Sequence, residues 1–139
     1  MLKSLFFVLL VVAVAQSQLW SNCGTSADHF QITDVTVNPP VPVKGQDITV
    51  YASGVLNEQV TGGNVHAVIK YGFLTIVNKN EPFCSSDNPV PCPVPAGNYN
   101  HTVSATIPAN APSGKYTANI VAVDQNNQEI ACVNVNVNL

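Results

Sequence analysis

Apolar and polar residues alternate with a period of two along most of the chain beyond residue 30. This alternation is typical of strands that have one buried and one solvated face, and no 3.6-residue helical period competes with it there. It predicts strands over residues 30–37, 48–53, 65–71, 73–77, 99–107, 116–122 and 131–139. A change of parity near Thr33 and Asp34 predicts a β-bulge within the first strand.

Turn-forming residues separate these strands. Glycine, proline and asparagine gather at residues 39–45, 62–63, 96–98, 111–114 and 124–127. About seven short strands divided by such turns predict an all-β fold, an antiparallel β-sandwich. Residues 81–96 hold five of the ten prolines, so we expect them to form an irregular connection instead of a strand.

The N-terminus follows a different pattern. Lys3 precedes an uninterrupted apolar run from Leu5 to Ala15. A basic start, a short apolar segment and small residues near its end are typical of a secretory signal peptide, whereas a membrane span needs about 20 apolar residues. We therefore expect residues 1–17 to be a signal peptide, removed after Ala15 or Ser17, and residues 18–139 to form one domain. The expected location is the secretory pathway, either secreted or in the endolysosomal lumen.

Charged residues make up only 9% of the 139 residues, although 46% are hydrophobic. Asparagine-rich strand faces supply polar surface, and Asn100 begins the only N-glycosylation sequon, Asn100-His101-Thr102. The chain has five lysines, no arginine and eight acidic residues. Because nucleic-acid binding needs a basic patch, we do not expect a nucleic-acid partner.

Four cysteines follow the predicted signal peptide: Cys23, Cys84, Cys92 and Cys132. An even number in a secreted chain predicts two disulfides. Cys84 and Cys92 flank the proline-rich segment and are near enough in sequence to close it, which leaves Cys23 to pair with Cys132. No pair has the Cys-x-x-Cys spacing of a zinc site, so we expect no metal.

The residues that carry most enzyme chemistry are scattered. His29, His66 and His101 are far apart in sequence, and no phosphate-binding, dinucleotide-binding or metalloprotease motif occurs. The acidic residues fall mostly at strand ends and turns, where solvated or turn-forming carboxylates are expected. We therefore expect neither catalytic residues nor a cofactor.

A set of residues spread over the mature chain resembles a known family. In order, these are Cys23-Gly24, Lys44-Gly45-Gln46 before residues 48–55, Tyr71-Gly72, Cys92-Pro93, Tyr99, and a strand from Tyr116 to Asp124 that leads to Cys132. In this order of cysteines and strands the sequence resembles the ML (lipid-recognition) domain family. Within that family it is similar to the phosphatidylglycerol/phosphatidylinositol transfer proteins and the soluble Niemann-Pick type C sterol carrier.

The resemblance implies an immunoglobulin-like sandwich that holds a lipid tail between its sheets, with the same two disulfides. It implies a monomer that contacts membranes transiently and moves a phospholipid of the phosphatidylglycerol or phosphatidylinositol type between them. Val77, Ile107 and Ala111 match the mouth of the family's pocket, and the small Ala111 favours acyl chains over sterol. The alternatives are a sterol carrier of the same fold and an extracellular immunoglobulin-like recognition module without a lipid cavity.

Inward-facing apolar residues fill the core of any sandwich. The resemblance makes some of them candidate lipid contacts: Ile48, Val50, Val65, Ile69, Tyr71, Val77, Tyr99, Val103, Ile107, Ala111, Tyr116, Ile120, Val133 and Val135.

Overall fold

The computed structural model describes residues 19–85 and 91–139, so the predicted signal peptide (residues 1–17) lies outside the described residues and stays a prediction. The described part of the chain forms eight strands: β1 (Trp20–Asn22), β2 (Phe30–Asn38), β3 (Asp47–Leu56), β4 (Asn64–Tyr71), β5 (Leu74–Pro82), β6 (Gly97–Thr106), β7 (Lys115–Val123) and β8 (Glu129–Asn138). No helix in that part is long and apolar enough to cross a membrane.

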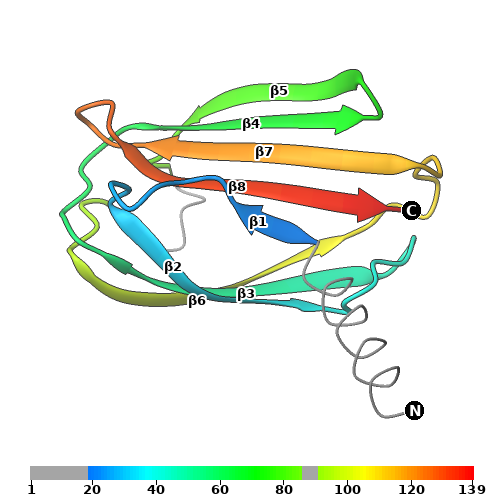
Figure 1. Ribbon diagram of the computed structural model, residues 1–139, viewed down its shortest axis with the longest axis horizontal. Coiled ribbons are helices and arrows are strands. Elements are labelled where there is room, and N and C mark those ends of the chain that lie inside the picture. Colours follow the sequence, from blue (N-terminus) through cyan, green and yellow to red (C-terminus); the bar gives the residue numbers. More distant parts are fainter. Residues whose placement is uncertain (1–18, 86–90) are drawn as a thin grey trace, which may run out of the picture.

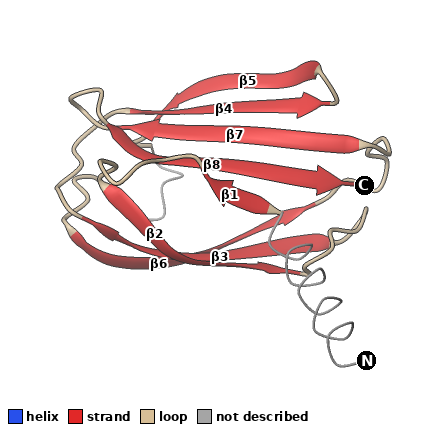
Figure 2. Cartoon of the chain, in the orientation of Figure 1, coloured by secondary structure: helices blue, strands red, loops and turns tan. Residues whose placement is uncertain are grey.

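The strands form two antiparallel sheets that lie face to face (Figure 1). One sheet has the order β1-β8-β7-β4-β5, and the other has the order β2-β3-β6. Figure 2 shows that strands and loops make up the whole described fold, so the predicted all-β sandwich is confirmed. The predicted bulge is confirmed as well, because the register of β2 against β3 shifts between Ile32 and Asp34.

Two strands differ from the sequence prediction. β1 was not predicted, because three residues are too few to show alternation; it pairs with β8, with Trp20 opposite Val135. β5 extends past Val77 to Pro82, so the first residues of the expected irregular segment belong to a strand. β5 is an edge strand whose final residues are polar and exposed, which explains why they carry no apolar alternation.

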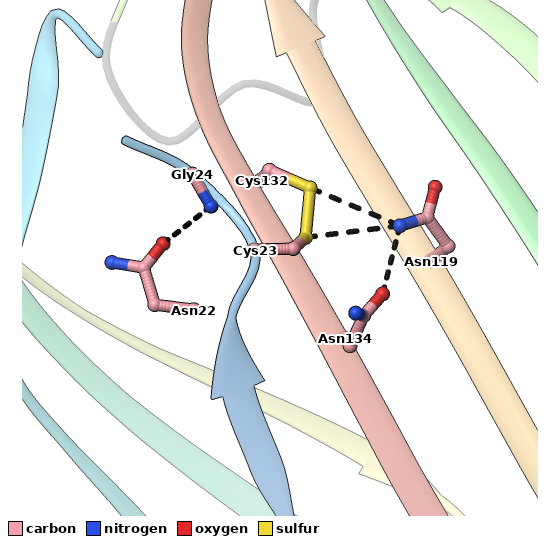
Figure 3. The surroundings of a disulfide bond; sticks show 6 residues. All are labelled: Asn22, Cys23, Gly24, Asn119, Cys132 and Asn134. Carbon is pink, nitrogen blue, oxygen red and sulfur yellow. Dashed lines mark hydrogen bonds between the residues drawn. A yellow bond between two sulfur atoms is a disulfide. The ribbon is translucent and has the colours of Figure 1, made fainter. Parts of the chain in front are cut away.

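The two disulfides join Cys23 to Cys132 and Cys84 to Cys92, which confirms the predicted pairing. Figure 3 shows Asn119 of β7 beside the first disulfide. The Asn119 Nδ2 donates a hydrogen bond to Asn134 Oδ1 at 2.8 Å, and it lies 3.7 Å from Cys23 Sγ and 3.8 Å from Cys132 Sγ. The segment after β1 is thereby fixed to β7 and β8.

The connections gather at two ends of the sandwich (Figure 1). One end carries the β3–β4, β5–β6 and β7–β8 connections, and we call it the closed end because a buried core lies there. The other end carries the β2–β3, β4–β5 and β6–β7 connections and the C-terminus, and we call it the open end.

Candidate functional site

The buried core at the closed end shows which faces of the two sheets look toward each other. Its side chains are at most 5% exposed and come from both sheets and their loops: Leu56, Val60, Val94 and Ile130. Tyr99 of the three-stranded sheet and Ala122 of the five-stranded sheet pack against this core. Since side chains alternate along a strand, every second residue from these positions belongs to an inner face.

The candidate lipid contacts within the strands fall on these inner faces. The three-stranded sheet contributes Ile48, Val50 and Tyr99, and the five-stranded sheet contributes Val65, Ile69, Tyr71, Val77, Tyr116, Ile120, Val133 and Val135. The side chain of Val103 lies outside the described part of the structure, and Ile107 and Ala111 lie in the β6–β7 loop at the open end. Contact of these residues with a lipid stays a prediction.

The inner faces are buried at the closed end but accessible elsewhere. Ile120 lies in the middle of β7, between Ala67 of β4 and Val133 of β8, and it is nevertheless 37% exposed. A close-packed sandwich would bury such a residue as fully as it buries Leu56, which is 5% exposed. The two sheets therefore leave apolar inner surface uncovered, and this surface is the candidate site.

One polar side chain shares the inner face of the three-stranded sheet. His101 lies two residues after Tyr99 on β6, and the two rings stack with centroids 6.2 Å apart. The buried Nε2 of His101 has no hydrogen-bond partner among the described residues. A buried nitrogen without a hydrogen-bond partner costs free energy. A hydrogen bond between this atom and a polar group of a ligand would therefore be favourable. His101 is not among the site residues expected from the sequence, although the period-two pattern places it on the face of Tyr99.

Tyrosines organise the open end. The rings of Tyr71 and Tyr116 have centroids 5.0 Å apart. The Tyr71 hydroxyl donates a hydrogen bond to the Ser113 carbonyl at 2.6 Å, and the Tyr116 hydroxyl donates one to the Pro112 carbonyl at 2.8 Å. Lys44 Nζ donates to Ser113 Oγ at 2.6 Å, which joins the β2–β3 loop of one sheet to the β6–β7 loop. The β6–β7 loop is thereby fixed across the open end.

Exposed apolar residues and lysines gather at the open end. Phe73 and Leu74 in the β4–β5 hairpin are 101% and 61% exposed, and Val41 in the β2–β3 loop is 70% exposed. Three of the lysines lie in or directly beside the loops of this end: Lys44, Lys70 and Lys115. Exposed apolar groups flanked by cations are suited to contact with an anionic lipid surface.

The closed end holds a cluster of ionisable side chains. His29 lies just before β2, Glu58 just after β3, and Asp124 just after β7. His29 Nε2 lies 3.4 Å from Glu58 Oε1 and 3.7 Å from Asp124 Oδ2. Asp124 Oδ1 accepts hydrogen bonds from the backbone N–H groups of Asn126 at 2.8 Å and Gln128 at 2.9 Å. Asp124 is therefore the turn-forming carboxylate that the sequence predicted, but it is buried.

These contacts shift the pKa values of the cluster. The hydrogen bond between the Glu58 and Asp124 carboxyl groups, together with burial, raises the pKa of Glu58. Burial alone would raise the pKa of Asp124, but hydrogen bonds from Glu58 and from two backbone N–H groups outweigh it and lower that pKa. Hydrogen bonds to the side chains of Gln128 and Asn57 raise the pKa of His29.

A second carboxyl pair lies beside this cluster. Asp28 is only 4% exposed, and its hydrogen bond to Glu129, together with burial, raises the pKa of Glu129. The sequence predicted the turn-forming role of Asp124 but not the burial of Asp28 and Asp124. Both are buried because connections far apart in sequence meet here, as the bond from the His29 N–H to the Glu129 carbonyl shows.

The outer faces of the sandwich are polar. A shallow depression on the five-stranded sheet is lined mainly by polar side chains: Ser21, Lys70, Thr117, Asn119, Asn134 and Asn136. On the other sheet, Asn100 of β6 is exposed and lies opposite Ser53 on the outer face. The side chain of Asn100 is accessible to a glycan, and its glycosylation stays a prediction.

Comparisons with known proteins identify a family and relatives whose sequences are similar to this chain. A family model described as the ML domain matches residues 17–139. A protein of Dictyostelium discoideum, named provisionally as a phosphatidylglycerol/phosphatidylinositol transfer protein, is 58% identical over 139 residues, which cover 100% of this chain and 99% of that protein. The phosphatidylglycerol/phosphatidylinositol transfer protein of Mycosarcoma maydis is 27% identical over 127 residues, which cover 88% of this chain and 66% of that protein.

Two solved structures share the fold. A Niemann-Pick type C2 protein from the Japanese carpenter ant superimposes with a TM-score of 0.60 at 17% identity, covering 86% of this chain and 97% of that one. Chicken MD-1, crystallised in complex with lipid IVa, superimposes with a TM-score of 0.62 at 15% identity, covering 86% of this chain and 87% of that one. At these identities the likeness concerns the fold alone.

Proposed function

Because the chain belongs to the ML domain family, we propose that it is a non-enzymatic lipid-transfer protein. It binds one phospholipid of the phosphatidylglycerol or phosphatidylinositol type, with the acyl chains between the two sheets, and moves it between membranes as a monomer. The names of the relatives supply the lipid class. The predicted signal peptide supports a location of this activity in the secretory pathway.

The uncovered apolar inner surface is the observation that carries the proposal. Ile120 is 37% exposed in the middle of an inner face, whereas Ile130 is 5% exposed at the closed end. Each buried methylene contributes about 0.8 kcal/mol, so an acyl chain of ordinary length gains on the order of 10 kcal/mol when it covers such a surface. The same gain compensates for removing the chain from a bilayer, as a carrier must do.

The head group is placed at the open end. The acyl chains run along the inner faces toward the closed core, so the polar head remains beside the β6–β7 loop. Lys44 and Lys115 supply positive charge there for a phosphate group, and the hydroxyl groups of Tyr71 and Tyr116 lie on the same side. His101 Nε2 supplies one polar contact deeper on the inner face.

The open end is also the surface that meets the membrane. Phe73 and Leu74 are exposed at the tip of the β4–β5 hairpin, and burying side chains of this size stabilises binding by about 1.5–3 kcal/mol each. The neighbouring lysines attract anionic head groups. Contact is therefore made with the end through which the lipid enters and leaves.

Transfer between liposomes tests the proposal. Purified protein is mixed with donor liposomes that contain fluorescent phosphatidylglycerol, phosphatidylinositol or cholesterol, and transfer to acceptor liposomes is followed. We expect phospholipid transfer that rises with protein concentration and exceeds cholesterol transfer. Faster cholesterol transfer would assign the protein to the sterol carriers, and no transfer of any lipid would contradict the proposal.

A matched pair of variants locates the activity. Ile120→Asp places a charge on the inner face and is expected to reduce transfer at least tenfold, because the charge must be desolvated when lipid binds. Tyr51→Asp is the control, since Tyr51 is also 37% exposed but lies on the outer face of β3. We expect the control to transfer lipid at the wild-type rate.

A further inference from the structure

We propose that His29, Glu58 and Asp124 form a binding site for a divalent metal cation of the zinc class at the closed end. The site lies at the opposite end of the sandwich from the proposed membrane contact. It uses none of the inner-face residues assigned to lipid, so it stands independently of the proposed function.

The geometry of the three side chains fits such an ion. The candidate ligand atoms all lie within 4.8 Å of one another. His29 Nε2 is 3.4 Å from Glu58 Oε1 and 3.7 Å from Asp124 Oδ2. Ligands at about 2.0–2.2 Å around a tetrahedral zinc ion are roughly 3.3–3.6 Å from one another. Small side-chain shifts are therefore enough to close the site around an ion.

A second observation is independent of the spacing. Asp124 is 2% exposed, and no N–H group among the described residues donates a hydrogen bond to its Oδ2, so its bond with Glu58 requires a proton on one of the two carboxyl groups. The buried Glu58 Oε1 is in the same condition. Two facing carboxyl oxygens that lack donors need a proton or a cation between them, because burying them unpaired is costly.

The charge around the cluster favours a cation. The only ion pairs in the described part of the chain that involve Glu58 or Asp124 are those with His29. The chain has no arginine, and Lys79 pairs with Glu81 on β5. A divalent ion bound by two carboxylates and a neutral imidazole leaves the buried cluster without net charge.

Neighbouring side chains orient the imidazole for metal binding. His29 Nδ1 lies 2.7 Å from Asn57 Oδ1, so the Nδ1–H donates to this amide and the Nε2 faces the carboxyl groups. A hydrogen bond from the second ring nitrogen is a recurrent feature of metal-ligating histidines. Gln128 Oε1 lies 2.9 Å from Nε2 and supplies a fourth ligand oxygen once the metal replaces the Nε2 proton. Imidazole combined with carboxylates suits zinc better than calcium or magnesium.

Calorimetric titration of the metal-free full-length mature protein with ZnCl₂ at pH 7.5 tests this site. We expect one zinc ion per chain, little binding of Ca²⁺ or Mg²⁺, and a thermal midpoint that rises with zinc and falls again with EDTA. Glu58→Gln is expected to weaken zinc binding at least tenfold. Glu81→Gln is the control, because Glu81 is 65% exposed and contacts only Lys79 among the ion pairs.

Two outcomes overturn the inference. One is no zinc binding by the wild type, which assigns a shared proton to the Glu58–Asp124 pair. The other is equal zinc binding by the wild type and Glu58→Gln, which places the metal on other residues. Neither outcome affects lipid transfer, so the failure of this inference and the failure of the proposed function are distinguishable.

Discussion

The backbone at Gly63 passes directly over the end of β7. Its φ is +116°, and a Cβ at this position would lie 2.0 Å from the carbonyl oxygen of Val123. Gly72 also has a positive φ, of +59°, but a Cβ there would meet nothing within 4 Å. The two glycines therefore separate the cost of backbone strain from the cost of a steric clash.

We predict that Gly63→Ala lowers the free energy of unfolding by about 3 kcal/mol or more, because strain and overpacking add together. Gly72→Ala is the matched control, with an expected loss of about 1–2 kcal/mol from the left-handed conformation alone. Urea denaturation of both variants measures the difference. Equal losses would show that the segment at Gly63 moves away from β7 without cost.

The role of a single residue can be predicted from the sequence only where it depends on the residue type and its immediate neighbours in the chain. The Gly62-Gly63 turn and the turn-forming role of Asp124 follow from residue type. The burial of Asp28 and Asp124 does not, because it arises where connections distant in sequence pack together. For the same reason the cluster around His29 is invisible in the sequence, where its members are 29 to 95 residues apart.

At the scale of elements, the Cys23–Cys132 disulfide attaches the short β1 segment to the five-stranded sheet. The bond closes a sequence separation of 109 residues, whereas Cys84–Cys92 closes a separation of 8. Chain-entropy arguments give the longer loop about 5 kcal/mol of stabilisation and the shorter one about 2.5 kcal/mol.

We therefore predict that the double variant Cys23→Ser/Cys132→Ser loses more stability than Cys84→Ser/Cys92→Ser. Denaturant unfolding of the two double variants under the same conditions measures the difference. A larger loss in the Cys84–Cys92 pair would mean that local folding of the proline-rich segment, not loop length, dominates.

The strands divide into those that alternation can predict and those that it cannot. β7 and β8 lie inside the five-stranded sheet, so they have one apolar face along their whole length and were predicted nearly to their ends. The last residues of β5 lie on an edge and are polar on both faces, and β1 is held by pairing and a disulfide. Edge strands are thus the part of this fold that sequence periodicity describes least.

At the scale of the whole molecule, the two ends of the sandwich differ. The closed end buries Leu56, Val60, Val94 and Ile130, whereas the open end exposes Phe73, Leu74 and Val41 and carries three lysines. This asymmetry could not be predicted from the sequence, since the chain as a whole is acidic, with a formal net charge of −3.

We predict that Phe73→Ser/Leu74→Ser reduces binding to vesicles of phosphatidylcholine and phosphatidylglycerol by at least tenfold, from the lost burial of two apolar side chains. Val55→Ser is the control, because Val55 is 42% exposed on the outer face of β3. Co-sedimentation with vesicles measures binding. An equal loss in the control would contradict docking through the open end.

The central claim is that a phospholipid occupies the apolar inner surface between the sheets. Native mass spectrometry of the protein after incubation with phosphatidylglycerol or phosphatidylinositol liposomes tests it most directly, with circular dichroism to verify that each variant is folded. We predict an added mass of one phospholipid per chain in the wild type and in Tyr51→Asp, and its loss in Ile120→Asp. A wild-type protein without added lipid, or an Ile120→Asp variant that retains it, would contradict the account.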